Sequence, residues 1–282
     1  MHQSKSEHDS RVVIQGVEIS LGFPEEFSFK WIGQQDVMDQ LLAAWLVIDE
    51  ADIPLNPRLV GKPGVGKTTL AYAAAKRLNK DVYIFQCTMD TRPEDLLITP
   101  VVGEGGGIRY VASSLVTAMI LGGVAILDEA NRMSEKSWAS LAPLLDTRRY
   151  IESIIAGLKV AAHPEFRICV TMNDDASTFE IPEYIHSRLQ PQIYLDFPES
   201  EEEKRILREN LPFVEENIMD YVVKFLQKAH AHNDNYTVRD GINIARYAAK
   251  RIKSLDGKKD MTENLLREAV IMTLGDDALM YL

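Results

Sequence analysis

The sequence is poor in cysteine, has no excess of positive charge and contains no long apolar run. Its 282 residues include two cysteines, and 31 Lys and Arg stand against 42 Asp and Glu, for a formal net charge of -11. A broad nucleic-acid-binding surface would be basic, so nucleic acid is not an expected partner, although a local basic patch is compatible with these numbers. No stretch approaches the roughly 20 apolar residues that a membrane-spanning helix needs, so we expect no membrane span.

The start of the chain lacks an apolar segment as well. Residues 1–10 are polar and contain nothing like the core of a secretory signal peptide, and we expect them to be a disordered tail. The two cysteines, Cys87 and Cys169, lie in apolar segments with strand character. This pattern favours reduced thiols in the core of a cytoplasmic protein over a disulfide framework. A catalytic thiol is the alternative, but neither cysteine has an activating neighbour in the sequence.

The most informative segment that is present is the glycine-rich loop at residues 61–68, Gly-Lys-Pro-Gly-Val-Gly-Lys-Thr. It matches the phosphate-binding loop pattern, in which a glycine and four further residues precede Gly-Lys-Ser/Thr. Glycines let the backbone turn its N–H groups toward a phosphate and leave room for it. Lys67 would neutralise the β- and γ-phosphates, and the Thr68 hydroxyl would bind Mg²⁺. The predicted nucleotide-binding residues of this segment are Gly61, Pro63, Gly64, Val65, Gly66, Lys67, Thr68 and Thr69.

A second pattern, at residues 123–132, is a short apolar strand that ends in two carboxylates, Asp128 and Glu129. It follows the glycine loop by roughly 60 residues, as the strand that completes a phosphate-loop ATPase site does. Asp128 would hold Mg²⁺, directly or through water, and Glu129 would orient and activate the attacking water. An Asp-Glu pair alone commonly closes a strand at the surface. Together with the glycine loop it predicts hydrolysis of a nucleoside triphosphate.

Three further positions have both a functional and a plain structural interpretation. Asn173 follows the predicted strand at 166–171 and would reach the γ-phosphate or its water, because ligands bind at the carboxyl ends of parallel strands; the alternative is an Asn that caps a turn. Ile32 and Gly33 precede a helical pattern and would contact an adenine ring, or only pack. Arg239 lies in the first turn of a predicted helix, where a cation is unfavourable unless an anion such as a phosphate is close.

Strands alternate with helices through the middle of the chain, which predicts a parallel sheet covered on both faces. The expected fold class is α/β, with a five-stranded parallel sheet sandwiched by helices and a smaller all-α domain at the C-terminal end. We predict an N-terminal tail and irregular segment at 1–28, the α/β core at 29–197 and a helical lid at 198–282. The lid helices are expected at about 200–210, 214–231, 237–254 and 262–275. Further predictions are a hairpin or loop at 91–110, a β-ribbon at 148–160 and a capping box at 200–203.

Taken together, these residues resemble a MoxR-type AAA+ ATPase over about residues 29–252. The segments that carry the resemblance are residues 61–68, 86–88 with 95–97, 127–132, 163–167, 171–173 and 187–189. The resemblance implies an ATP-driven ring, usually a hexamer, with ATP and Mg²⁺ as cofactors. It also implies that the subunits remodel a partner, often a protein with a von Willebrand A domain. Some relatives insert metals or activate metalloenzymes.

Individual roles follow from the same resemblance. Lys67 and Thr68 correspond to Walker A, and Asp128 and Glu129 to Walker B. Asn173 is similar to sensor 1. Arg188 is similar to the arginine finger that reaches a neighbouring subunit's γ-phosphate, and Arg239 to the sensor 2 arginine of the lid. The segment around Arg239, Tyr-Thr-Val-Arg-Asp-Gly, departs from the usual Ser-Pro-Arg.

Two other classes of function remain open at this level. One is a nucleotide-gated binding or scaffold module in which ATP fixes a shape and hydrolysis is slow or incidental. The other is a phosphate-loop kinase or nucleic-acid motor. The negative charge disfavours the motor, and no segment after the Asp-Glu pair has the character of a binding site for a small phosphate acceptor.

Overall fold

The computed structural model describes residues 11–28, 30–103, 106–174, 180–232, 234–254 and 263–282. The disorder expected for residues 1–10 lies outside these ranges. The described residues form two compact units. The first takes its residues from 11–28, 36–60 and 67–194, and the second from 30–35, 61–66 and 195–282. The domain boundaries after residues 28 and 197 stay a prediction.

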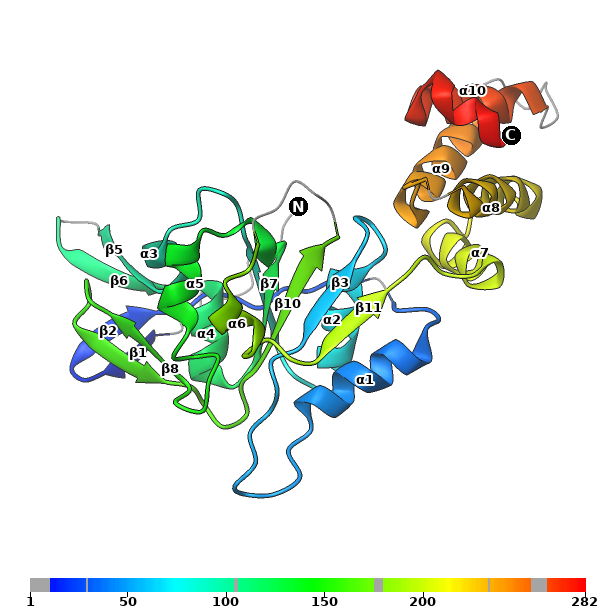
Figure 1. Cartoon of the computed structure of the whole chain (residues 1–282). Helices are drawn as coiled ribbons and strands as arrows, with labels where there is room; N and C mark the ends of the chain where they lie inside the picture. Colours follow the sequence, from blue (N-terminus) through cyan, green and yellow to red (C-terminus); the bar gives the residue numbers. More distant parts are fainter. Residues whose placement is uncertain (1–10, 29, 104–105, 175–179, 233, 255–262) are drawn as a thin grey trace. The chain divides into compact units, whose positions relative to one another are not determined.

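The main sheet has five parallel strands (Figure 1). In spatial order they are β11 (Gln192–Leu195), β3 (Arg58–Gly61), β10 (Arg167–Asn173), β7 (Val124–Asp128) and β4 (Val82–Gln86). β7 and β10 are central, and β10 is buried along its whole length, as expected for a parallel strand covered on both faces. In the register, Ile126 lies opposite both Ile84 and Cys169. The predicted α/β fold class is therefore confirmed.

Helices pack against the main sheet. α2 (Lys67–Arg77) and α4 (Ser114–Leu121) both pack against β7. α1 (Gln35–Trp45) is fixed to β10 because the Trp45 indole N–H donates to the Ile168 carbonyl at 3.0 Å. Ser134 caps α5 (Glu135–Leu141) by accepting a hydrogen bond from the Ser137 N–H. The remaining short elements of this unit are α3 (Pro93–Leu96), η1 (Ala130–Arg132) and α6 (Glu183–His186).

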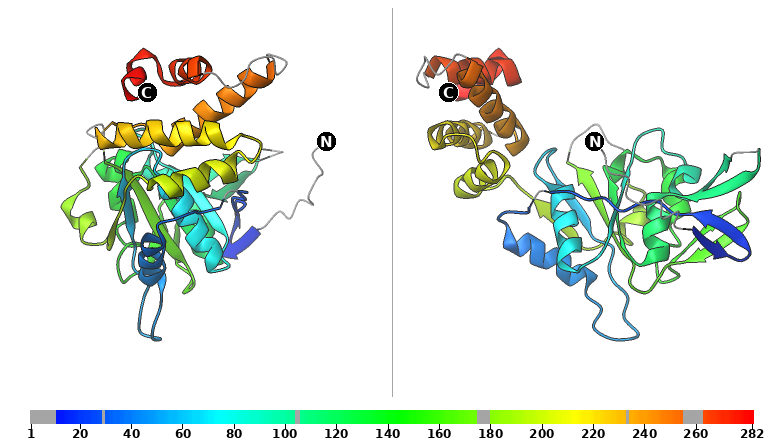
Figure 2. Two further views of the ribbon diagram at one scale, coloured as in Figure 1. Left: turned by 90° about the vertical axis from the view of Figure 1, so that its right-hand side faces the viewer. Right: turned by 180° about the vertical axis from the view of Figure 1, so that it is seen from behind.

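A second sheet joins two hairpins that are far apart in the sequence. Its order is β1 (Arg11–Ile14), β2 (Val17–Ser20), β6 (Ile108–Ala112) and β5 (Ile98–Val102). The first hairpin turns at Gln15 and Gly16, whose φ angles of 50° and 84° suit a two-residue turn. β2 then pairs in parallel with β6, and the two hairpins lie side by side in every view (Figure 2). A hairpin or loop was predicted at 91–110, whereas the segment at 1–28 was predicted to be irregular, and the pairing of β2 with β6 was not predicted.

The predicted ribbon is a separate two-stranded sheet, β8 (Tyr150–Ser153) and β9 (Leu158–Ala161). Its antiparallel register places Tyr150 opposite Ala161 and Glu152 opposite Lys159. Because side chains alternate along a strand, one face of the ribbon is buried and the other is turned outward.

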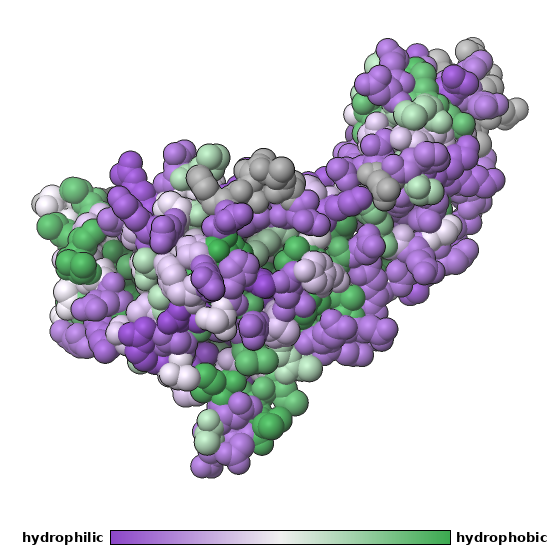
Figure 3. Space-filling model, viewed as in Figure 1, coloured by the Kyte–Doolittle hydropathy of each residue, from purple (hydrophilic) through white to green (hydrophobic). Residues whose placement is uncertain are grey.

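The loop between α1 and β3 projects from the first unit and exposes apolar side chains (Figure 3). Ile48 is 82% exposed and Leu46 is 61% exposed. The loop keeps its shape through local bonds, since Asp52 accepts from the Ile48 N–H at 3.0 Å and Asp49 from the Ala51 N–H at 2.9 Å. The Asp49 bond is an Asx turn, and the Asp52 bond reaches back four residues to close the loop, so both order it without a core.

The second unit contains the C-terminal helices. They are α7 (Ser200–Asn210), α8 (Glu216–Ala231), α9 (Val238–Ser254), α10 (Glu263–Leu274) and η2 (Asp276–Tyr281). Their core includes Phe225, Ile244 and Val270, all nearly inaccessible to solvent. The predicted helices agree closely with these bounds, and Thr237 is the N-cap of α9, since its hydroxyl accepts from the Asp240 N–H at 3.4 Å. Within the described ranges, every helix is too short or too polar to cross a bilayer.

The capping box predicted at residues 200–203 is wrong. α7 begins after Glu199, and no side chain caps it. The Glu203 carboxylate, which the box would direct to its own helix end, is fully buried and accepts a 2.8 Å hydrogen bond from the Gln227 amide of α8. Packing between α7 and α8 therefore decides the conformation of Glu203.

Candidate active site

Two hydroxyl groups converge on one carboxylate oxygen at the carboxyl edge of the main sheet. Thr68, in the first turn of α2, donates to Asp128 Oδ1 at 2.6 Å. Thr171, from β10, donates to the same oxygen, also at 2.6 Å. Asp128 is the last residue of β7, so the register of β7 against β10 and the start of α2 together build the cluster. Lys67, beside Thr68, is only 6% exposed.

The oxygens of this cluster fit Mg²⁺ in their chemistry. Mg²⁺ prefers hard oxygen ligands and in phosphate-binding sites takes few of them from the protein, the rest coming from phosphates and water. Thr68 and Asp128 offer one hydroxyl and one carboxylate in direct contact. In the described part of the chain no group of three or more His, Cys, Asp or Glu could enclose a metal. A Mg²⁺ ion here would therefore depend on the phosphates of a nucleotide.

Glu129, which follows Asp128, receives donors from three different elements. Asn173 Nδ2 donates to Oε1 at 3.2 Å, and Gln86 Nε2, from the end of β4, lies 3.4 Å from Oε2. Arg132 Nε forms an ion pair with Oε2 at 2.8 Å. The backbone of Glu129 is left-handed, with φ 54°, and its N–H donates to Thr171 Oγ1 at 3.0 Å. A non-glycine residue in this region is uncommon and is held there by its surroundings.

The structure places Asn173 beside Glu129. Asn173 is the last residue of β10 and is 8% exposed, and its carbonyl accepts from Asn131 Nδ2 at 2.9 Å. It is thus part of the cluster, while the sensor role stays a prediction. Sequence reasoning assigned no role to Thr171 or Gln86. For Thr171 a signal was available, because residues two apart on a strand share a face, so Thr171 and Asn173 point the same way.

The glycine loop needs its glycines for geometric reasons. Gly64 and Gly66 have φ angles of 81° and 99°, which favour glycine. A Cβ on Gly61 would lie 2.3 Å from the Leu195 carbonyl oxygen, and one on Gly64 would lie 2.8 Å from the Thr237 side chain. The backbone can therefore follow this path only without side chains, which is the condition for a cradle of N–H groups around phosphate.

Within the second unit, the N-cap of α9 lies against this loop. Thr237, which contacts Gly64, precedes Arg239 by two residues. Arg239 is exposed, and in the described part of the chain no carboxylate forms an ion pair with it. The segment with Ile32 and Gly33 is fastened to α7, because Glu202 Oε1 accepts from the Gln34 N–H at 2.9 Å. The predicted contacts of Ile32, Gly33 and Arg239 with a nucleotide stay predictions.

Arg188 lies apart from the carboxylate cluster. Its guanidinium donates to the Tyr184 carbonyl of α6, and its Nε lies 3.5 Å from Asp146 Oδ2. Within the described residues it forms no hydrogen bond or ion pair with Asp128 or Glu129. In a single subunit, therefore, Arg188 is held by its own chain.

Both cysteines are buried and free. Burial raises the pKa of the Cys87 and Cys169 thiols. A catalytic thiol acts as the thiolate, which a buried apolar site disfavours. The alternative of a cysteine nucleophile therefore finds no support in the geometry.

Residues 58–189 match the family model described as AAA domain, dynein-related subfamily. An uncharacterised protein of Staphylococcus epidermidis is 26% identical over 175 residues, which cover 60% of this chain and 66% of that protein. One from Staphylococcus haemolyticus is 25% identical over 232 residues, which cover 79% of this chain and 85% of the relative.

Solved structures share the fold. The RuvB Holliday junction branch migration motor of Thermotoga maritima aligns with a TM-score of 0.58 at 17% identity, over 88% of this chain and 72% of that one. A putative ATPase from Cytophaga hutchinsonii aligns with a TM-score of 0.52 at 17% identity, over 85% and 81%. At this identity the likeness concerns the fold alone, and the MoxR subtype stays a prediction. The domain match supports an AAA domain at residues 58–189, and the solved structures share its fold.

Proposed function

We propose that this protein hydrolyses ATP as a ring of identical subunits, which we expect to be a hexamer, and uses the energy to remodel or activate a partner protein. The observation that carries the proposal is the convergence of Thr68, Thr171 and Glu129 with Asp128, together with the loop that requires glycine and directly precedes Lys67 in the sequence. The resemblance to MoxR-type proteins supports a protein client, for instance one with a von Willebrand A domain. The two buried, free cysteines favour a cytoplasmic location.

The chemistry assigns a task to each side chain. Loop N–H groups and Lys67 bind the phosphates, and Thr68 and Asp128 hold Mg²⁺, which neutralises charge on the phosphate oxygens. Glu129 accepts a hydrogen bond from the attacking water and orients it in line with the bond that breaks. Asn173 fixes the position of the Glu129 carboxylate through its 3.2 Å bond.

We assign Arg188 to the site of a neighbouring subunit. Its own chain keeps it on Asp146 and Tyr184, which is compatible with a residue whose target lies on another subunit. An arginine supplied in this way contributes on the order of 10³–10⁵ in rate in related phosphate-loop enzymes. Turnover per subunit should therefore rise with protein concentration until assembly is complete.

Replacing Glu129 by glutamine tests the assignment of the base. The amide keeps the size of the side chain but cannot accept the proton of the water, so Glu129→Gln should bind ATP and lose hydrolysis by about 10²–10⁴-fold. ATP binding is measured by equilibrium dialysis and hydrolysis by phosphate release. The exposed carboxylate of Glu209, which pairs only with Lys30 in the described residues, gives the control Glu209→Gln. Hydrolysis at the wild-type rate by Glu129→Gln would refute the role.

A nucleotide-gated binding or scaffold module is the second candidate. The observation in its favour is the ion pair of Glu129 with Arg132 at 2.8 Å, which engages the carboxylate needed for water activation. In such a module hydrolysis stays slow because Glu129 is occupied. Turnover measured with and without a bound client distinguishes the two, since only the remodelling ATPase is expected to respond strongly.

Nucleic acid is not the substrate that we propose. The likeness to RuvB concerns the fold, and the net charge of -11 opposes a polyanion over long range.

A further inference from the structure

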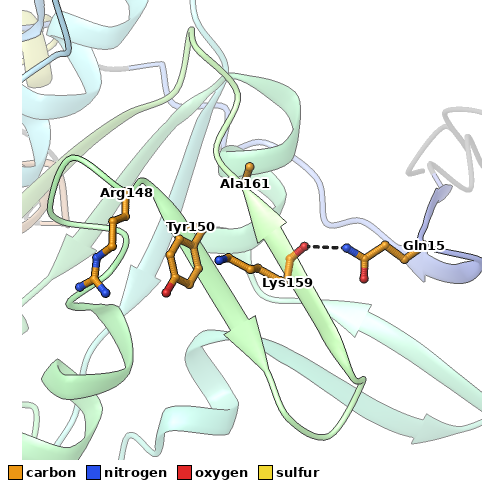
Figure 4. A pocket seen from close by; sticks show the side chains of 5 residues that line it. All are labelled: Gln15, Arg148, Tyr150, Lys159 and Ala161. Carbon is orange, nitrogen blue, oxygen red and sulfur yellow. Dashed lines mark hydrogen bonds between the residues drawn. The ribbon is translucent and has the colours of Figure 1, made fainter.

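A pocket opens on the outward face of the β8–β9 ribbon, and none of the residues that line it belongs to the candidate active site. It is lined by Gln15, Arg148, Tyr150, Lys159 and Ala161 (Figure 4). Gln15 reaches it from the turn between β1 and β2 and donates from Nε2 to the Lys159 carbonyl at 3.3 Å. The pocket therefore exists only because two segments distant in the sequence meet.

An aromatic ring and two cations form the centre of the pocket. Lys159 Nζ lies 3.7 Å from the centroid of the Tyr150 ring, and the guanidinium carbon of Arg148 lies 5.8 Å from it. Figure 4 shows Tyr150 between the two cations. Such contacts hold flexible side chains in place. Ala161, directly across the ribbon from Tyr150, is small and leaves space beside the ring.

The positive charge of the pocket is only partly compensated. Asp146 accepts from Arg148 Nε at 3.0 Å and from Nη2 at 2.7 Å. These bonds hold the pKa of the Asp146 carboxyl at about 2. A guanidinium has five N–H donors, so Asp146 leaves some unused. Lys159 forms no ion pair within the described ranges, although Glu152 lies opposite it in the register.

We propose that this pocket binds a short acidic peptide segment of a client, with one carboxylate on Lys159, a second on Arg148, and its chain resting against the Tyr150 ring that lies between them. The binding stands on these contacts, whereas the idea that a client docks here for remodelling rests on the function proposed above. One carboxylate would accept charge-assisted hydrogen bonds from the ammonium, and the other from the free guanidinium donors. The Gln15 side chain marks one end of the site.

The number of charges favours a peptide over nucleic acid. Binding to a phosphate backbone commonly uses several cations in a row, which release counterions together. Here two cations are present, one already shares Asp146, and Glu152 lies on the same outward face. A polyanion would meet this acid and the negative field of the whole chain, while a short acidic segment would meet mainly the pocket.

The test is fluorescence anisotropy of a labelled peptide carrying a run of glutamates, titrated with the full chain in the absence of nucleotide. The same peptide with glutamines is the ligand control. The wild-type chain should bind only the glutamate peptide, and Lys159→Gln should weaken binding about tenfold, the loss of one charged hydrogen bond. Tyr150→Leu should weaken it as well.

Lys76→Gln is the matched protein control. Lys76 Nζ also lies over a tyrosine ring, 5.5 Å from the centroid of Tyr72, but outside this pocket. The Lys76→Gln variant should bind the glutamate peptide with the affinity of the wild-type chain. Circular dichroism checks that each variant is folded. The proposal would be overturned if Lys159→Gln and Lys76→Gln bound the glutamate peptide with equal affinity. It would also be overturned if the wild-type chain bound the glutamine peptide, or if it did not bind the glutamate peptide. The proposal would also be overturned if the wild-type chain bound a short oligonucleotide more tightly than the glutamate peptide and Lys159→Gln weakened that binding. The pocket would then be assigned to nucleic acid.

ATP hydrolysis, measured on the same proteins without peptide, separates the two proposals. Lys159→Gln should hydrolyse ATP at the wild-type rate. A chain that binds the glutamate peptide but never hydrolyses ATP would refute the proposed function and leave the pocket standing. A chain that hydrolyses ATP but ignores the peptide would refute the pocket alone.

Discussion

At the scale of single residues, Thr171 has the largest unpredicted role. Its hydroxyl donates to Asp128 and accepts from the Glu129 N–H, so one side chain orders both carboxylate residues. It is 1% exposed, and no water can replace these bonds without a rearrangement. The left-handed backbone of Glu129 depends on this contact, which makes Thr171 a positioning residue for the water-activating carboxylate.

Thr171→Val therefore should reduce both stability and turnover. Valine fills the same space but leaves Glu129 N–H without its acceptor, at a cost of about 1–3 kcal/mol in the free energy of unfolding. The hydrolysis rate should fall while ATP binding persists, and Thr171→Ser should restore the rate. Urea unfolding and phosphate release measure the two effects. An unchanged rate in the valine variant would remove Thr171 from the positioning role.

At the scale of secondary-structure elements, a buried carboxyl group links two lid helices. Burial raises the pKa of Glu203 in α7 to about 7. The hydrogen bond from Gln227 of α8 lowers this pKa, but its effect is the smaller of the two. His230 Nδ1, also in α8, lies 3.8 Å from Glu203 Oε1, and burial lowers the pKa of this imidazole. The contact between α7 and α8 is therefore most favourable with Glu203 protonated.

The pH dependence follows from the sign of this shift. A carboxyl whose pKa is higher in the folded chain binds a proton better there, so its contribution to stability is present at low pH and is lost as pH rises toward and through about 7. Glu203→Gln, which mimics the protonated form, should be more stable than the wild type at about pH 8, by up to about 3 kcal/mol, and similar near the unfolded pKa.

Urea unfolding at both pH values, followed by circular dichroism, measures this effect. The exposed Glu209 on the same helix supplies the control Glu209→Gln, which should show no such difference between the two pH values. A stability gain of Glu203→Gln that is equal at both pH values would contradict a titrating Glu203.

At the scale of the whole molecule, the proposed active site is incomplete within one subunit. Arg188 is held by Asp146, and Asp146 also holds Arg148 of the ribbon pocket. One carboxylate therefore contacts the proposed arginine finger and the proposed docking site. The proposed function requires that Arg188 leave Asp146 when a neighbouring subunit offers a phosphate.

Mixing two inactive variants tests whether Arg188 acts between subunits. Arg188→Ala should bind ATP and lose turnover, as should Glu129→Gln. In an equal mixture, an Arg188→Ala subunit keeps an intact site and receives its finger from a Glu129→Gln neighbour, so about a quarter of the interfaces in a head-to-tail ring should be active. Phosphate release by the mixture, with each variant alone as control, measures this. A mixture as inactive as its components would place the finger elsewhere.

Elements whose signals are local could be predicted from the order of amino acids. The glycine loop at 61–68, the strand that ends in Asp128 and the helices of the lid were predicted within a few residues, because backbone freedom, apolar periodicity and capping act over short distances. The same signals predicted the sheet, since alternating strands and helices leave few arrangements open. The capping box failed where a distant partner, Gln227, competed for Glu203.

Which distant side chains meet depends on how the whole chain folds. Thr68 and Thr171 share one oxygen of Asp128, Gln15 reaches Lys159, and Asp146 joins Arg148 to Arg188. These contacts depend on strand register and on the order of strands in the sheets, and no periodicity along the chain records either. A shift of one residue in a strand would turn Asp128, Lys159 or Thr171 to the opposite face, so the fold as a whole fixes what these residues can do.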